Sequence, residues 1–456
     1  MDKAPLRTFS SGIAFRSGDD IIVTSDAGSI AALDDIPSPF SAGLVKMDKP
    51  LIYLETSRGC PFSCAFCISS IETGVRSFSM ERIVRDLSYL MENNALTVKL
   101  VDRTFNYDAK RANEIWGFIL LQNRNSRFHF EIAADLLTSE NITLLQKVPP
   151  GLFRFEIGVQ SGEEETLVRV GRETNLVKLF ANVEFLRERT GIVIHLDLVA
   201  GLPHEDFIGF LHSLQRLFAV RPHHIQVEPL KVLKGSPMES IAQEEGYQFS
   251  DYPPYKILKT PWLSYREITR VEKISRLLDL FYNSGKFRTT MQAVAERVEL
   301  AYFFDALAHF TQINKISGDL SQPGLFGFFR QFIISYFEGE AEKSITDVLF
   351  YDFCLSEYPA SGALAIFWGP DRESPQATKG RGETTDIVKT RHIKKGCKTR
   401  TYLQQFKNDY SSSPWGKGEA EILFVYISGP GLGLCVKAVE LSEGRVARAT
   451  PPSLHG

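Results

Sequence analysis

The chain has 456 residues, of which 43% are hydrophobic and 23% charged, and its formal net charge is −3 at pH 7. This length suits two or three domains, and the composition is that of a globular protein with a sizeable core. The small charge disfavours nucleic acid as a partner, and no apolar run reaches the roughly 18 to 20 residues that span a bilayer. With no signal-peptide pattern at the N-terminus, the sequence predicts a cytoplasmic protein without a membrane segment.

Residues 1–50 are too few to bury a core of their own. Strand-like runs at 12–16 and 21–24 flank a turn, and Pro37 and Pro39 mark an extended linker. We expect this segment to be a linker or the remnant of a preceding domain.

Residues 51–262 are expected to form one α/β domain. Short β-rich runs alternate with amphipathic runs whose apolar residues recur every three or four positions. This alternation predicts a parallel sheet, open or curled into a partial barrel, with ligands at the C-terminal ends of its strands. The strand candidates are 51–55, 98–102, 128–133, 153–159, 192–199 and 224–229, and the helix candidates are 80–92, 110–122, 175–189 and 206–220.

Residues 263–456 are expected to form a C-terminal domain of unknown function. Its first part, to about residue 340, has helical periodicity, and strand-like runs follow at 421–428 and 434–441. The intervening residues 379–417 are basic and polar. Within them the run 389–400 is typical of a solvated loop, with RNA binding as the less usual alternative. The pattern predicts a mainly helical extension with a small α+β part.

Three of the six cysteines, Cys60, Cys64 and Cys67, lie within eight positions directly after the first strand candidate. In a reducing compartment this spacing indicates metal binding rather than disulfides. Three thiolates can hold three irons of a 4Fe-4S cluster and leave the fourth iron open for a ligand. Zinc is the alternative, but it takes four ligands, and the remaining cysteines are scattered. The loop therefore predicts an iron–sulfur cluster.

The pattern Cys60-x3-Cys64-x-Phe66-Cys67 resembles the signature of the radical S-adenosylmethionine (radical SAM) superfamily. Over residues 50–260 the resemblance is to the branch of cobalamin-binding enzymes, coproporphyrinogen dehydrogenases and methylthiotransferases. It implies a partial (β/α)6 TIM-like barrel, S-adenosylmethionine (SAM) on the open iron, and reductive cleavage of SAM to a 5′-deoxyadenosyl radical. It also implies an external electron donor of flavodoxin or ferredoxin type. The substrate, a small molecule or a peptide, and the catalytic residues are not identified by the sequence.

Further positions match the residues that hold SAM in this branch. Where the superfamily often has Gly-Gly-Glu, this chain has Asp102-Arg103-Thr104, as in the cobalamin-type subgroup. The alternative for each polar residue is a partner within the protein, such as Lys99, because an unpaired polar group inside a strand is costly. The resemblance implies these SAM contacts: Phe66, Asp102, Thr104, Glu131, Gln160, Ser161, Arg172 and Asp197.

Two neighbouring segments have interpretations of their own. His195 shares a strand face with Asp197, so it is either a hydrogen-bonded core histidine or a substrate-side acid or base. The run His204-Glu205-Asp206 is typical of an acidic helix start.

The role of cobalamin stays open. Cobalamin-binding relatives carry a large domain with an Asp-x-His-x2-Gly loop before the cluster, and residues 1–59 have no such loop. The function predicted is radical SAM chemistry on an unknown substrate, with cobalamin-dependent methyl transfer as one outcome. One alternative is a tRNA methylthiotransferase, although that class has a second cysteine trio upstream and residues 1–59 contain no cysteine. The other is a non-catalytic iron–sulfur or zinc module, which has no need of the SAM residues.

Overall fold

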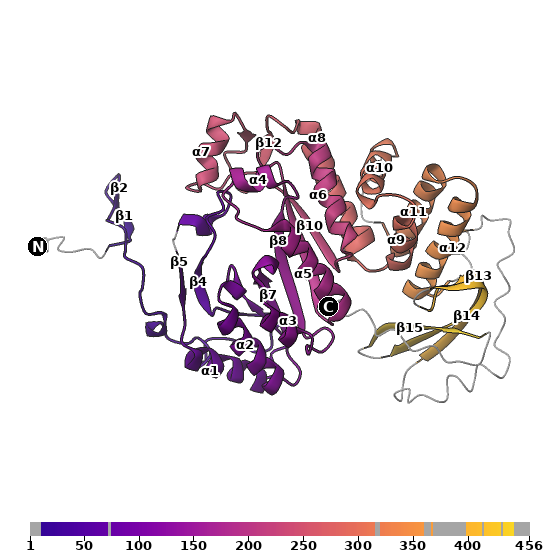
Figure 1. Ribbon diagram of the computed structural model, residues 1–456, viewed down its shortest axis with the longest axis horizontal. Coiled ribbons are helices and arrows are strands. Elements are labelled where there is room, and N and C mark those ends of the chain that lie inside the picture. The colour runs from indigo at the N-terminus through magenta and orange to yellow at the C-terminus, as the bar shows by residue number, and fades with distance from the viewer. Residues whose placement is uncertain are drawn as a thin grey trace, which may run out of the picture.

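The computed structural model describes residues 11–71, 74–314, 320–359, 366–367, 398–412, 415–429 and 432–441. Figure 1 shows an α/β body followed by a group of helices and, beyond them, a small sheet. Within the described part of the chain, no helix has both the length and the apolar composition needed to cross a bilayer.

A six-stranded parallel sheet forms the centre of the α/β body. Its strand order is β10-β9-β8-β7-β6-β3, and every neighbouring pair is parallel. From β3 to β10 the strands are added to the sheet in chain order, with helical crossovers between them, while β4 and β5 pair separately; the sheet is open between β3 and β10. This confirms the predicted α/β fold with a partial (β/α)6 arrangement. The strands are β3 (Ile52–Leu54), β6 (Thr97–Leu100), β7 (Arg127–Ile132), β8 (Phe153–Gln160), β9 (Val193–Ala200) and β10 (His224–Pro229).

The helices predicted between these strands are confirmed. They are α1 (Met80–Glu92), α2 (Ala109–Gln122), α5 (Leu176–Arg189) and α6 (Phe207–Ala219). Each begins after a residue whose side chain accepts a hydrogen bond from a backbone N–H of the first turn, which satisfies a group that the helix leaves unpaired. These residues are Ser79, Asp108, Asn175 and Asp206. Three shorter helices were not predicted: α3 (Ser139–Leu145), α4 (Glu164–Arg169) and α7 (Pro237–Glu244).

The two faces of the sheet differ in polarity. Along β7 and β8 every second residue is apolar and buried, because that face packs on the helices. The indole of Trp116 in α2, for example, lies 6.1 Å from the ring of Phe130 and 5.6 Å from that of Phe155. The alternate positions carry charged or polar side chains and turn away from the helices. We call this the polar face; its members include Lys99, His129, Glu131, Glu156, His195, Asp197 and His224.

The C-terminal part is helical and then α+β, as predicted. Its helices are α8 (Tyr265–Leu277), α9 (Arg288–Ala295), α10 (Leu300–Ile313), α11 (Gln322–Tyr336) and α12 (Gly339–Ser356). They are followed by an antiparallel sheet of β13 (Lys398–Asp409), β14 (Gly416–Gly429) and β15 (Leu432–Glu440). α8 packs on β10 and α10 packs on α6, so the helices continue the core of the α/β body.

The basic run 389–400 was expected to be a solvated loop, but its last three residues begin β13. The strand itself was not predicted, and its side chains Tyr402 and Phe406 are buried. Residues 389–397 of the basic run lie outside the described residues. At the other end of the chain, β1 (Ala14–Ser17) pairs with β2 (Asp20–Val23), and Figure 1 shows this hairpin standing apart from the body.

Candidate functional site

The cysteine loop leaves the sheet at the C-terminal end of β3. A short hairpin follows at once, in which β4 (Ser57–Cys60) pairs with β5 (Gly74–Ser77). The hairpin requires glycine at position 59, since Gly59 has a φ of +94° and a Cβ there would lie 2.1 Å from the carbonyl oxygen of Gly74. The sequence analysis predicted the position of the loop but not this hairpin.

Two backbone hydrogen bonds fix the loop to the rest of the domain. The Ala65 N–H donates to the Val170 carbonyl at 2.8 Å, and the Met238 N–H donates to the Ala65 carbonyl at 3.0 Å. The loop is therefore held between the end of α4 and the start of α7. Cys64 is buried, and Cys60 and Cys67 are partly buried.

The three cysteines fit a cluster better than a single zinc ion. All three are free thiols. Among the described residues, their sulfur atoms do not form a set lying within 4.8 Å of one another. A structural zinc site normally takes four protein ligands, whereas three cysteines suit a cluster with one open iron.

Arg172, which was predicted to contact SAM, lies against the cysteine loop. Its Nη1 is 3.8 Å from Cys64 Sγ, and its Nη2 donates to the Gly158 carbonyl at 2.9 Å. The guanidinium also stacks over the ring of Phe62, at 4.6 Å from the centroid. Burial raises the pKa of the Cys64 thiol, and the charge of Arg172 opposes that rise. Arg172 thus supplies positive charge where thiolates would gather.

Asp102 is almost completely buried and fully engaged within the protein. One carboxylate oxygen accepts from the Thr56 N–H at 3.1 Å, and the other accepts from the hydroxyls of Thr56 and Ser57. Arg111 lies 3.9 Å away and donates to the Thr56 carbonyl at 2.9 Å. Burial raises the pKa of Asp102, while the hydrogen bonds from Ser57 and Thr56 oppose the rise. Through these bonds Asp102 joins the end of β6 to the hairpin that carries Cys60. Direct contact between Asp102 and SAM stays a prediction, and this geometry does not favour it.

Two further predicted residues lie at the cysteine loop. Thr104 is buried, and its Oγ1 is 3.5 Å from Cys60 Sγ. Phe66, which lies between Cys64 and Cys67 in the chain, is partly buried and packs against the hydrophobic core. Both predictions of SAM contact remain untested, but both residues stand beside the cysteines.

Gln160 and Ser161 form an irregular end to β8. Gln160 has a φ of +72°, and the register with β9 shifts between Gly158 and Gln160. The Gln160 amide folds back over Gly158, where a Cβ would lie 2.0 Å from its Nε2. The Ser161 hydroxyl instead points inward and donates to Glu205 at 2.6 Å. Its predicted role as a SAM contact therefore competes with an internal partner.

Glu205 is a residue that sequence reasoning missed. It accepts hydrogen bonds from Ser161 and from Ser213 at 2.7 Å, and it is 1% exposed. Burial raises its pKa to about 7, against the opposing effect of the two serine hydroxyls. The acidic run at 204–206 was interpreted as a helix start, which is correct for Asp206, the N-cap of α6. No sequence signal distinguished the buried acid from its neighbour.

The remaining predicted residues, Glu131 and Asp197, lie on the polar face. Lys99 contacts Glu131 at 3.4 Å and Glu156 at 3.0 Å. Although burial opposes it, contact with His129 and Lys99 lowers the pKa of Glu156 to about 2. Burial and the charge of Glu156 raise the pKa of Glu131.

Asp197 has a different partner. Its Oδ1 lies 3.0 Å from His195 Nε2, and burial raises its pKa despite this histidine. Glu131 and Asp197 therefore both have a neighbour within the protein, Lys99 and His195, which was the alternative to contact with SAM.

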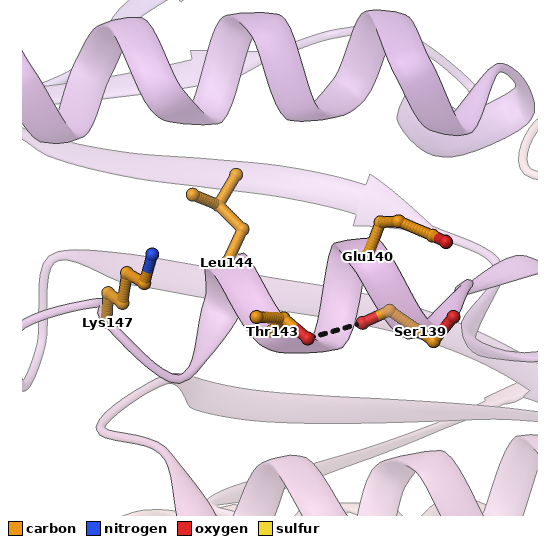
Figure 2. A pocket seen from close by; sticks show the side chains of 5 residues that line it. All are labelled: Ser139, Glu140, Thr143, Leu144 and Lys147. Atoms are coloured by element: carbon orange, nitrogen blue, oxygen red, sulfur yellow. Dashed lines mark hydrogen bonds between the residues drawn. The ribbon is translucent and has the colours of Figure 1, made fainter.

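A surface depression lies elsewhere, on α3. Figure 2 shows its lining, Ser139, Glu140, Thr143, Leu144 and Lys147, of which none is a predicted site residue. The dashed line marks the Thr143 hydroxyl donating to the Ser139 carbonyl at 2.8 Å, an ordinary bond within a helix. This depression contributes no chemistry to the site.

Comparison with known proteins identifies the domain that carries the cysteine loop. Residues 54–216 match the family described as the radical SAM superfamily. They form a radical SAM domain. The family implies a 4Fe-4S cluster and SAM as cofactors. Residues 243–424 match a second family, described only as a protein of unknown function (DUF4080).

Several curated proteins resemble parts of this chain. An uncharacterized methyltransferase of Pyrococcus horikoshii is 41% identical over 95 residues, covering 19% of this chain and 20% of that protein. The hopanoid C-3 methylase of Methylococcus capsulatus is 30% identical over 155 residues, covering 33% of this chain and 29% of that protein. The chain thus spans less than a third of either relative.

A solved structure to which the chain is similar is that of the radical SAM methyltransferase TsrM of Kitasatospora setae with cobalamin and a 4Fe-4S cluster bound. It is 15% identical with a TM-score of 0.41, covering 66% of this chain and 61% of that one.

Proposed function

We propose that this chain is a radical SAM enzyme in which Cys60, Cys64 and Cys67 hold a 4Fe-4S cluster with one open iron. The observation that carries the proposal is the geometry of the cysteine loop. Three free thiols stand within eight positions on the loop that follows β3, and Arg172 lies beside Cys64. When bound, the cluster supplies an electron that cleaves SAM into methionine and a 5′-deoxyadenosyl radical.

The chain's own residues would divide the work of holding SAM. Gln160 and Glu131 lie at or near the ends of their strands, with polar atoms that a bound ribose or ammonium group can satisfy. Thr104 and Phe66 border the cysteines. Asp102 and Ser161 act one step further away: Asp102 accepts from the Thr56 N–H, and the Ser161 hydroxyl donates to the Glu205 carboxylate. This division assigns contact to the first four residues and positioning to the last two.

The reaction class we propose is methyl transfer to a small molecule or peptide. The support is that both curated relatives described above are named as methyltransferases or methylases. Within this proposal, residues 51–262 are the catalytic domain and residues 263–456 shape the substrate side. Residues 1–50 are a linker or domain remnant. An external flavodoxin- or ferredoxin-like protein in the cytoplasm would supply the electron.

Anaerobic reconstitution with iron and sulfide tests the central claim. After reduction with dithionite in the presence of SAM, we expect about four irons per chain and release of 5′-deoxyadenosine. Cys64→Ala should lose both iron and product. Cys354→Ala, which removes a buried thiol of α12, is the matched control and should retain both.

The possible outcomes separate the alternatives. Iron that survives in Cys64→Ala would refute the cluster assignment. A wild-type cluster without product, even when cobalamin and candidate methyl acceptors are added, would favour the non-catalytic module. Product formation that depends on added cobalamin would assign the chain to cobalamin-dependent methyl transfer.

A further inference from the structure

Three side chains with metal-ligand atoms meet on the polar face of the sheet, separately from the cysteine loop. They are Glu156 of β8 and His195 and Asp197 of β9, and their ligand atoms lie within 4.8 Å of one another. The strand register sets His195 directly beside Glu156. The two-residue period of a strand brings Asp197 to the same face. The arrangement is therefore built by the sheet itself rather than by a loop.

Two of these atoms have only each other as a partner. His195 Nε2 and Asp197 Oδ1 lie 3.0 Å apart as an ion-pair contact, but the angle between them is poor for a hydrogen bond. His195 is 9% exposed, so bulk water does little to compensate. When the histidine is neutral with its proton on Nδ1, two lone pairs meet across this gap. A cation placed between them would satisfy both atoms.

The charge of the polar face also favours a cation. Lys99 and His129 both contact Glu156 through the same oxygen, Oε2, which leaves Oε1 for another partner. Lys99 is shared between Glu131 and Glu156, so one lysine faces two carboxylates. One lysine therefore serves two carboxylates of this face, and Glu156 keeps an oxygen for a further ligand.

We propose that Glu156, His195 and Asp197 bind one divalent transition-metal cation, of the Mn²⁺ or Fe²⁺ class, distinct from the cluster on the cysteine loop. One imidazole nitrogen with two carboxylates suits such ions, whereas Ca²⁺ and Mg²⁺ take oxygen ligands. Three protein ligands leave coordination positions for water or a substrate oxygen. Oδ2 of Asp197 stays available for the predicted SAM contact. The site does not depend on the proposed function, since its ligands lie outside the cysteine loop.

Mn²⁺ is the probe of choice, because thiolates select softer metals and the cysteine loop will compete little for it. Full-length protein with its reconstituted cluster is titrated with Mn²⁺ and followed by electron paramagnetic resonance. We expect one Mn²⁺ per chain, with hyperfine coupling to an imidazole nitrogen. His195→Gln and Asp197→Asn should each weaken binding at least tenfold.

Two matched controls lie on the same face. The His224 ring stands 4.1 Å from that of His195, and His224→Gln should keep both the affinity and the nitrogen coupling. Glu131→Gln removes a nearby carboxylate outside the three ligands and should leave the affinity within threefold.

The proposal is overturned if the unaltered chain binds no stoichiometric Mn²⁺ or shows no nitrogen coupling. Equal weakening by Glu131→Gln and Asp197→Asn would also overturn it, because it would mean diffuse attraction by a negative face. Since the titration reads metal binding alone, loss of SAM cleavage cannot be mistaken for failure of this site.

Discussion

Nη1 of Arg172 lies 3.8 Å from Sγ of Cys64, although 108 positions separate the two residues in the chain. The same guanidinium donates to the Gly158 carbonyl and stacks on Phe62. Arg172 therefore joins the cysteine loop to β8 and places a fixed positive charge beside one proposed cluster ligand. Its effect on an electron added at that point can be measured.

Replacing Arg172 should make the cluster harder to reduce. A charge this close to the site stabilises an added electron by about 1 kcal/mol in a solvent-like medium, which corresponds to roughly 40 mV for one electron. We expect Arg172→Met to lower the midpoint potential by about that amount in a redox titration. Arg169→Met is the control, because Arg169 pairs with Glu245 at 2.6 Å instead. Equal potentials in the two variants would contradict a role for Arg172 at the cluster.

The hairpin that carries Cys60 offers a matched pair of glycines. Gly59 and Gly74 both have positive φ, but only at Gly59 would a Cβ meet backbone, the carbonyl oxygen of Gly74. Gly74→Ala should cost about 1 to 2 kcal/mol of stability and retain the iron. Gly59→Ala should displace the hairpin and lose most of the iron. Iron and sulfide analysis after reconstitution distinguishes the two, and equal iron contents would show that the close approach is unimportant.

Asp102 should matter more for stability than an ordinary surface acid. Asp102→Ala leaves three hydrogen-bond donors without their acceptor and Arg111 without its nearby opposite charge, and breaking such a buried pair costs about 3 kcal/mol or more. Asp108→Ala removes only the N-cap of α2 and should cost about 1 kcal/mol. Urea unfolding of both variants measures the difference. Similar losses would mean that the Asp102 network is weaker than its geometry indicates.

Because of Glu205, we expect the free energy of unfolding to fall as the pH rises. Its folded-state pKa is raised from 4.5 to about 7 by burial, so between these values the folded chain holds a proton that the unfolded chain has released. The stabilisation is present below about pH 4.5 and is lost by about pH 7 or slightly above. Its size is about 3 kcal/mol.

Glu205→Gln removes this titration and keeps an oxygen that can accept from Ser161 and Ser213. The free energy of unfolding of the wild type relative to Glu205→Gln should therefore drop by about 3 kcal/mol between pH 4.5 and pH 8. Glu184→Gln, which changes an exposed acid of α5, serves as the control. A pH-independent difference for Glu205→Gln would mean that the buried acid does not titrate in this range.

The sheet and its main helices were predictable because they follow simple periods. The run 80–92 coincides with α1, and the strand candidate at 224–229 coincides with β10. The β4–β5 hairpin was missed because its strands are short and half-exposed, so they show no alternation of apolar residues. β13 was missed because its charged residues masked the alternation that buries Tyr402.

For the candidate site, the residue types indicated where side chains lie in the fold better than they indicated which partners those side chains contact. The cysteine site was predicted from spacing alone, and Arg172 was predicted from the family resemblance; the structure places Arg172 beside Cys64. The inward hydroxyl of Ser161 depends on Glu205, which is 44 positions away. The hydrogen bonds and ion pair that occupy the Asp102 carboxylate come from Thr56, Ser57 and Arg111. Such long-range pairings leave no pattern in a single sequence.

The alternation along β7, β8 and β9 has a consequence for how this domain can diverge. On each strand, alternate residues point to opposite faces. Phe130 and Phe155 lie on the face that packs on the helices, and Glu131 and Glu156 lie on the polar face. Changes on the polar face can accumulate without loosening the packing on the helix-facing side. A library confined to the polar face should therefore yield mostly folded variants, so new specificities can be selected on an unchanged scaffold.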